Sequence, residues 1–446
     1  MFGTSTIKTP LFQESWFGTT DPATKMVQDG RWVHTTIPIM KDGNPSKIEP
    51  DVYGRLRAPW NVNDRPFLAR GMAQMCNVHA DGLYPWPTCE SHYKLVTSNP
   101  DFYSWVWASL YDPHGPVHIW IGGVLDCEDP YSVEIENLVG KDTAIILAQL
   151  AFVHRKDMFR DGIFSCIGGV AVTESPEMIF ESGVCGCHGY DLTHGDDYVN
   201  IFESMVFMKE LMFDSDDYTR REVVRIVCGT VINDGDQLQA SSSLDPSFWL
   251  THPTMERLWM FSVLTGRITD FEWPDSDVTY IASNGAVYTQ PISKYSEECL
   301  GHRGSDVFPF DILANDVNDF TVQTGIAGNP KEGGNNFTNR EVLAAFDPRI
   351  NALPYVYDTF KWTHCEADGF DLNDAWLAKD TGESYSGTGA AGRAESSEDP
   401  KTRDGYRRTV GGRTVFNEDD MLFPLYGTLR AKMADLKARK NNPTGR

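Results

Sequence analysis

The chain has 446 residues, of which 41% are hydrophobic and 12% aromatic, a composition typical of a globular protein with a large core or two to three domains. The formal net charge of −24 argues against a nucleic-acid-binding protein, because phosphate repulsion would have to be overcome by a local basic patch. No apolar run approaches the length of a membrane-spanning helix, so the composition predicts a soluble protein without a membrane span.

The first segment, residues 1–53, is rich in Gly, Pro, Asp and Thr, with short β-like runs such as residues 32–38. This pattern predicts a loop segment with an edge strand or two. Residues 1–16 lack the basic stretch and apolar core of a secretory signal, so either the protein stays where it is made or a leader has been removed.

A helical pattern covers residues 66–78, and residues 101–110 are aromatic and apolar enough for a buried helix. That second helix leads into the stretch 113–123, Pro-His-Gly-Pro-Val-His-Ile-Trp-Ile-Gly-Gly. His114 and His118 stand four positions apart, so on a helix both imidazoles leave the same face and can share one metal ion.

A third imidazole is expected from His252. It lies in the stretch 244–259, where the turn signal Asp245-Pro246 is followed by a helical pattern. Three imidazoles without a neighbouring thiolate suit copper, zinc or iron, and a mononuclear iron or zinc enzyme is one alternative for such a site.

Between these two stretches, residues 142–159 and 199–213 have helical patterns, and a Gly- and Cys-rich part at 163–189 is β-like. The second helical pattern ends in an acidic run at 214–217. The total length suits a subdomain with a small core of its own.

The nine cysteines are an odd number and many for a reducing compartment. They predict several disulfides plus one free thiol, and favour an extracytoplasmic or organellar lumen. The motif Cys185-Gly-Cys187-His188 has donors for zinc or copper, but it has too few partners in the sequence, so a disulfide is favoured.

Residues 376–416 shift to Gly, Ser, Glu and Arg, which predicts a flexible linker. The tail, residues 417–446, ends in a basic helical pattern. On so acidic a protein this helix is expected either to stay solvated or to dock against the protein's own body or a partner.

The two histidine stretches together resemble the second-copper half of the type 3 copper proteins: tyrosinases, catechol oxidases and haemocyanins. The likeness is carried by His114-Gly-Pro-Val-His118 with Gly122-Gly123, by Asp245-Pro246 and Phe248, and by His252 with Glu256-Arg-Leu-Trp259. It extends to the flanks 56–61 and 353–358. The resemblance implies that His114, His118 and His252 bind one copper ion, and that residues 125–238 are an insertion between its ligands.

The resemblance also implies an oxidoreductase that converts phenols or o-diphenols to quinones with O2. Such an enzyme holds two coppers, but only His34, His79 and His92 precede His114, and the first-copper half is missing from the chain. Two hypotheses follow. In the first, another polypeptide carries the first-copper helices; in the second, the chain is a structural or binding subunit that has lost dicopper chemistry.

Four further positions are expected beside the copper ligands or in the substrate pocket. Gly115 stands where an Asn of the family would help to deprotonate monophenols, which favours diphenol oxidation. Thr251 replaces the first of the family's paired histidines, and Glu256 replaces an Asp. Glu256 would accept an imidazole N–H or form a helix-surface pair with Arg257. Phe248 and Trp249 are expected in the core in the first place, and as walls of the pocket in the second.

The predicted fold is mixed and mainly α at the metal site, with half of a tyrosinase-like helical bundle, peripheral β and loop elements and a large insertion. The copper-binding region comprises residues 54–124 and 239–375, and the insertion subdomain comprises residues 125–238.

Overall fold

The computed structural model describes residues 9–40, 50–81, 83–99, 101–127, 133–167, 184–193, 195–205, 207–230, 232–276, 278–281, 287–290, 303–307, 329–331, 334–350, 355–373, 408–410, 413–415 and 432–439. The chain forms two compact units. Unit 1 comprises residues 1–86, 116–251 and 428–446, and unit 2 comprises residues 87–115 and 252–427. The predicted segment boundaries at 53, 124, 238, 375 and 416 stay predictions.

Unit 1 contains a four-stranded sheet in the order β2-β1-β3-β6. Its strands are β1 (Gln74–Met75), β2 (Val78–His79), β3 (Val124–Cys127) and β6 (Ile232–Asp234). The β1–β3 pair is parallel, whereas β1–β2 and β3–β6 are antiparallel. A disulfide between Cys76 and Cys127 ties the β1–β2 turn to the end of β3.

The predicted helix at residues 66–78 is wrong, because β1, β2 and their turn lie there instead. Met72, Ala73, Cys76 and Asn77 all have a positive φ, which a helix does not allow. In residues 32–38 the expected strand is reduced to a single bridge between Thr36 and Phe67. The described residues of the N-terminal segment also contain two 3-10 turns, η2 (Pro10–Phe12) and η3 (Gly30–Trp32), and further isolated bridges such as Thr20–Val27 and Ile39–Arg55.

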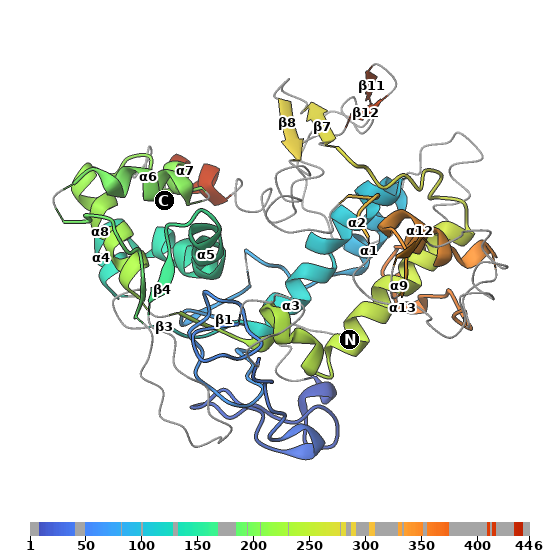
Figure 1. Ribbon diagram of the computed structural model, residues 1–446, viewed down its shortest axis with the longest axis horizontal. Coiled ribbons are helices and arrows are strands. Elements are labelled where there is room, and N and C mark those ends of the chain that lie inside the picture. Colours follow the sequence, from blue (N-terminus) through green and yellow to red (C-terminus); the bar gives the residue numbers. More distant parts are fainter. Residues whose placement is uncertain are drawn as a thin grey trace. The chain divides into compact units, whose positions relative to one another are not determined.

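Among the described residues between β3 and β6, unit 1 has the helices α4 (Ile135–Val139), α5 (Lys141–Arg160), α6 (Asp197–Ser204), α7 (Met208–Leu211) and α8 (Asp217–Gly229). In Figure 1, α6 lies beside α7 and α8, and α4 lies beside α5. The helix predicted at 142–159 is confirmed as α5, whose buried face includes Ile146, Leu150 and His154.

The helix predicted at 199–213 is interrupted, because Phe207 adopts a left-handed conformation between α6 and α7. The acidic run that follows starts another helix. The Asp216 side chain accepts the backbone N–H of Thr219 and so caps α8.

The predicted β-like part contains β4 (Ser165–Ile167) paired with β5 (Val184–Gly186). Two disulfides hold it, Cys166–Cys185 and Cys187–Cys228. The preference for disulfides over a metal at Cys185 and Cys187 is therefore confirmed. The remaining cysteine without a described partner, Cys299, lies outside the described residues.

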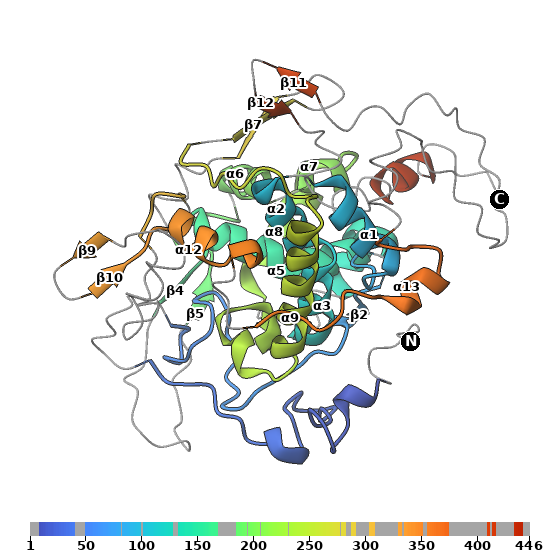
Figure 2. The ribbon, with the colours of Figure 1, turned by 90° about the vertical axis from the view of Figure 1, so that its right-hand side faces the viewer.

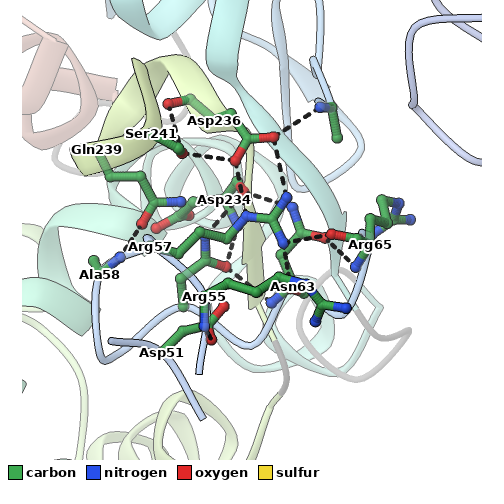
Figure 3. Close-up of polar contacts among 12 residues, drawn as sticks. Asp51, Arg55, Arg57, Ala58, Asn63, Arg65, Asp234, Asp236, Gln239 and Ser241 are labelled. Carbon is green, nitrogen blue, oxygen red and sulfur yellow. Dashed lines mark hydrogen bonds and ion pairs between the residues drawn. The ribbon is translucent and has the colours of Figure 1, made fainter. Parts of the chain in front are cut away.

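A buried ion pair joins the N-terminal loops of unit 1 to the segment after β6. Arg57 Nε donates to Asp236 Oδ1 at 2.8 Å and Arg57 Nη2 donates to Asp236 Oδ2 at 3.1 Å. Ser241 and the backbone N–H of Ala69 donate to the same carboxylate. Figure 3 shows Arg57 beside Asp236, with Ser241 on the other side of the same carboxylate and Asn63 and Arg65 near the guanidinium. Both side chains are completely buried, so the pair fixes the two segments against each other.

Unit 2 is built on α1 (Cys89–Ser98), α2 (Phe102–Tyr111), α12 (Asn339–Ala345), α13 (Thr363–Ala367) and most of α9 (Phe248–Leu264). The predicted buried helix at 101–110 is confirmed as α2, with Asp101 as its cap. Trp259 of α9 packs between Phe102 and Trp105 of α2. Figure 2 shows α2 and α9 side by side.

The core of unit 2 continues through Leu95, Leu258, Phe261 and Trp362, and the Cys89–Cys365 disulfide joins α1 to α13. The strands of unit 2 form short antiparallel pairs: β7 (Val278–Ile281) with β8 (Val287–Gln290), β9 (Asn329–Lys331) with β10 (Gly334–Asn336), and β11 (Arg408–Val410) with β12 (Arg413–Val415).

The basic tail forms a helix at residues 432–439, which docks on unit 1. Met433 is buried, and the Lys437 ammonium lies 4.9 Å from the ring centroid of Phe213. Arg439 lies 3.4 Å from Asp142 of α5. The tail helix therefore packs against the protein's own body, which is one of the expected alternatives.

The described residues are mixed and mainly helical, as predicted. None of the helices in the described parts of the chain is long and apolar enough to cross a membrane.

Candidate metal centre

Helix α3 (His114–Gly122) carries the first two predicted ligands, as expected from their spacing. Pro116 fits its first turn, where a missing N–H breaks no intrahelical hydrogen bond. The helix ends where Gly123 adopts a φ of +62°, a conformation that favours glycine. His114 and His118 therefore lie one turn apart on one continuous helix.

Helix α9 carries His252 near its first turn. Asp245 stabilises the turn just before this helix. Its Oδ1 accepts hydrogen bonds from the backbone N–H of Ser247 at 2.9 Å and from the Ser247 hydroxyl at 2.6 Å. The turn signal at Asp245-Pro246 thus has a clear local role.

The imidazoles of His114 and His252 face each other within unit 2. Their Nε2 atoms are 3.0 Å apart, and the ring centroids are 4.8 Å apart at an interplanar angle of 77°. A hydrogen bond between two neutral rings requires one Nε2 to carry a proton and the other to accept it. If neither Nε2 is protonated, the two lone pairs repel each other, and a cation bound to both nitrogens would remove this repulsion.

His118 is oriented within unit 1 by a backbone carbonyl. Its Nδ1 lies 2.7 Å from the carbonyl oxygen of Gln237. Because a carbonyl only accepts, Nδ1 carries the proton and Nε2 is the acceptor nitrogen of the ring. An imidazole N–H held by a backbone carbonyl is the usual arrangement around a histidine that binds a metal.

His114 and His252 of unit 2, together with His118 four residues after His114 on the same helix, form a group of side chains that could hold a metal ion. All three side chains are partly buried. Metal–imidazole bonds of about 2.0–2.1 Å place the nitrogens of a tetrahedral site roughly 3.4 Å apart. The 3.0 Å between His114 Nε2 and His252 Nε2 in unit 2 is close to this distance. The donor set therefore fits a transition-metal ion.

A polar chain in unit 1 supports the Gln237 carbonyl. The Gln237 amide donates to the Ser247 hydroxyl at 2.7 Å, and that hydroxyl donates to Asp245. Asp245 in turn forms a bidentate pair with Arg70, at 2.6 and 3.1 Å, and both side chains are completely buried. The neighbouring residue Asp236 is held by Arg57. Two buried ion pairs thus fix the segment that orients His118.

Close backbone packing in unit 1 fixes the same segment from the side of α3. A Cβ added at Gly235 would lie 1.9 Å from the carbonyl oxygen of Gly122, and one added at Gly122 would lie 2.9 Å from the backbone nitrogen of Leu238. The glycines at these positions therefore let α3 approach the 3-10 turn η5 (Asp236–Leu238) directly.

The residues expected beside the ligands or in the pocket each have their own local contacts. A Cβ at Gly115 would lie 2.6 Å from the Leu110 carbonyl oxygen, so packing alone accounts for this glycine. The Phe248 ring centroid lies 6.2 Å from that of His118. The Thr251 hydroxyl donates to the Ser247 carbonyl at 3.0 Å. The core position expected for Trp249 is wrong: this side chain is 62% exposed, and its indole N–H donates to the Ser243 carbonyl.

Glu256 contacts two tyrosines of unit 2. Its carboxylate accepts hydrogen bonds from the hydroxyls of Tyr355 and Tyr357. Burial, reinforced by this carboxylate, raises the pKa of Tyr355 to about 12 and also raises the pKa of Tyr357. Arg257 donates instead to the carbonyls of Thr359 and Lys361. The tyrosine contacts join the 355–358 flank to α9.

The earlier histidines have other partners. The His34 ring packs near Phe67 and the His79 ring near Trp120, while His92 Nδ1 bonds to the Thr88 carbonyl. Within the described part of the chain, the other group with potential metal donors is Cys89, His364 and Cys365.

No family model, no curated protein and no solved structure matches this chain.

Sequence reasoning missed Arg70, Asp236, Gln237 and Ser247 as positioning residues. The segment 234–239, Asp-Gly-Asp-Gln-Leu-Gln, reads as an ordinary turn. The contact with His118 uses the backbone carbonyl of Gln237, which every residue type has, so no side-chain pattern marks it. Asp236 is the one feature of this segment that could have pointed to its role, because an aspartate that becomes buried needs a charged or hydrogen-bonding partner elsewhere in the chain.

Proposed function

We propose that His114, His118 and His252 bind copper, and that the chain is a tyrosinase- or catechol-oxidase-like oxidoreductase. The observation that carries this proposal is the 3.0 Å distance between the Nε2 atoms of His114 and His252, with His118 one turn after His114 on the same helix. Three nitrogen donors without a thiolate suit copper, although zinc and iron take the same ligands. The resemblance of the two histidine stretches to type 3 copper proteins favours copper among the three.

The proposed reaction oxidises an o-diphenol to its quinone. Each diphenol gives up two electrons and two protons, so two diphenols reduce one O2 to two waters. Bound copper would supply the redox centre. The chain's own residues orient the imidazoles, through the Gln237 carbonyl at His118, and hold the site in a partly buried position.

A second polypeptide is part of the proposal. A two-copper enzyme needs three more imidazoles, and the other group of potential ligands in the described residues contains a single histidine. Another chain would supply the first-copper helices and complete a tyrosinase-like bundle.

The other candidate is a structural or binding subunit that has lost dicopper chemistry. The presence of a single three-histidine group among the described residues favours it over a complete oxidase within one chain. The two candidates differ in metal content. The oxidase complex should contain about two coppers per chain and consume O2 with catechol, whereas the subunit should hold at most one metal ion and consume none.

His118→Ala tests the copper site directly. We expect this variant to lose the copper that the parent retains after gel filtration, because two imidazoles hold the ion much more weakly than three. Copper content is measured by elemental analysis of the native complex together with identification of co-purifying chains. His34→Gln, which removes an imidazole outside the group, is the control. Equal copper in the parent and His118→Ala would refute the site.

A further inference from the structure

A second group of metal donors lies in unit 2, formed by Cys89, His364 and Cys365. A donor atom from each of the three side chains lies within 4.8 Å of the other two. Cys89 is the first residue of α1, and His364 and Cys365 lie in α13. The two cysteines form a disulfide. None of these residues belongs to the three-histidine group, so the two sites are independent.

The elements that carry these donors are held by more than the disulfide. Cys89 and Cys365 belong to the same core cluster, which includes Leu95 of α1 and Trp362 just before α13. The Cys365 backbone N–H also bonds to the Trp362 carbonyl at 2.8 Å. Because apolar packing supports both helices, breaking the disulfide leaves the two sulfurs facing each other.

A second imidazole lies on α1, one turn after Cys89. His92 Nδ1 lies 2.7 Å from the Thr88 carbonyl oxygen, so Nδ1 carries the proton and Nε2 is the acceptor nitrogen. His92 lies three residues after Cys89 on α1, so the two side chains leave the same face of the helix. This spacing makes His92 the candidate for a fourth coordination position.

We propose that reduction of the Cys89–Cys365 disulfide creates a Zn²⁺ site, with Cys89, Cys365 and His364 as ligands and His92 in the fourth position. Thiolate and imidazole donors are the usual ligands of structural zinc, and Cys-x-x-His on one helix places two of them on one face. Tetrahedral zinc needs its donor atoms roughly 3.4–3.8 Å apart, which the observed grouping allows with small side-chain movements.

The redox step is a thiol–disulfide exchange. A dithiol reductant gives two electrons, breaks the sulfur–sulfur bond and becomes a disulfide itself, and the protein gains two thiols. Zinc binding then displaces the two thiol protons. The position of Cys89 at a helix N-terminus favours its thiolate, and the exposed His364 offers the ion a path from solvent. The site is thus open to zinc in the reduced protein and closed in the oxidised one.

The test uses the full chain in a His118→Ala background, so that the three-histidine group does not contribute. Protein reduced by a phosphine is gel-filtered with Zn²⁺, and bound zinc is counted by elemental analysis. We expect the reduced parent to retain about one zinc more per chain than Cys89→Ala/Cys365→Ala treated in the same way. This comparison subtracts zinc bound by thiols of the other disulfides. Equal zinc in the two proteins would overturn the proposal.

A second variant guards against a folding defect in the cysteine double variant. His364→Asn changes an exposed side chain and keeps the disulfide. We expect it to weaken zinc binding in the reduced protein about tenfold or more, and to alter the thiolate-to-metal absorption when Co²⁺ replaces zinc. An unchanged affinity and an unchanged cobalt spectrum would exclude His364 as a ligand and refute the site as proposed.

Discussion

Asp245 shows how a single carboxylate serves both stability and the metal centre. It neutralises the buried Arg70, prepares the first turn of α9 through Ser247, and through Ser247 reaches the Gln237 amide. An ion pair without solvent contact is sensitive to the loss of either partner, because the remaining charge is then buried alone.

We therefore expect Asp245→Asn to lower the free energy of unfolding by about 3–5 kcal/mol. It should also weaken copper binding about 10–100-fold, since the support of His118 loosens. Urea unfolding and copper titration measure the two effects. Asp275→Asn, which breaks the half-exposed pair with Arg340, is the matched control and should cost about 0–1 kcal/mol. Similar losses in both variants would contradict the role of burial.

Asp234 is a buried carboxyl whose pKa is raised, so that it keeps its proton to a higher pH than an ordinary aspartate. Burial raises its pKa to about 7, although Arg155, Lys156 and the Trp60 side chain each lower it. One of its oxygens, Oδ1, has no hydrogen-bond partner. A folded-state pKa above the unfolded value of 3.8 means that the native protein binds the proton more tightly. This contribution to stability is present below about pH 4 and is lost as the pH rises through about 7.

Asp234→Asn should remove this pH dependence, because an amide does not ionise. The stability of the variant relative to the parent should rise between about pH 4 and pH 8, with a slope of up to about 1.4 kcal/mol per pH unit. Chemical denaturation at several pH values measures the difference. Asp196→Asn, a change at an exposed aspartate, is the control. Parallel curves for the parent and Asp234→Asn would show that Asp234 does not titrate in this range.

At the scale of elements, the decisive packing in unit 1 is that of the end of α3 against the turn η5. Gly122 and Gly235 allow backbone to approach backbone there, and Gly123 supplies the left-handed residue that ends the helix. The Gly-Gly pair noted in the sequence therefore positions the Gln237 carbonyl against His118.

Gly235→Ala should push these two elements apart, because its Cβ would lie 1.9 Å from the Gly122 carbonyl oxygen. We expect a loss of about 1–3 kcal/mol or more in the free energy of unfolding, together with weaker copper binding. Gly229→Ala, where a Cβ meets nothing within 4 Å, is the control and should be neutral or slightly stabilising. Thermal unfolding and copper titration of both variants distinguish steric overlap from a general effect of alanine.

For the whole molecule, charge is the dominant feature. A net charge of −24 makes the folded chain repel itself, and the basic helix at 432–439 offsets part of this by docking near α5 through Arg439 and Asp142. Screening by salt should therefore stabilise the fold.

We expect the melting temperature to rise when the ionic strength increases from about 10 mM to about 150 mM, as the Debye length falls from roughly 30 Å to roughly 8 Å. Differential scanning calorimetry measures the shift. Equal effects of NaCl and KCl would identify screening, whereas a lower melting temperature would mean that attractive surface pairs outweigh the net repulsion.

The sequence by itself determined the helices with strong local signals. The spacing of His114 and His118, the Asp101 cap of α2 and the long apolar pattern of α5 depend on neighbours a few residues apart, so they are readable from the chain. The cysteine count predicted disulfides, and four are present in the described residues. The copper assignment stays a prediction.

Only the tertiary structure decided which distant groups meet. Arg70 and Asp245 are 175 positions apart and His118 and the Gln237 carbonyl 119 positions apart, and no local pattern specifies such pairs. Likewise, residues 66–78 look helical in composition, but pairing of β1 with β3 and positive φ values at four positions override that preference. The physical reason is that local preferences amount to a few tenths of a kcal/mol per residue, whereas burying a charged pair or a strand involves several.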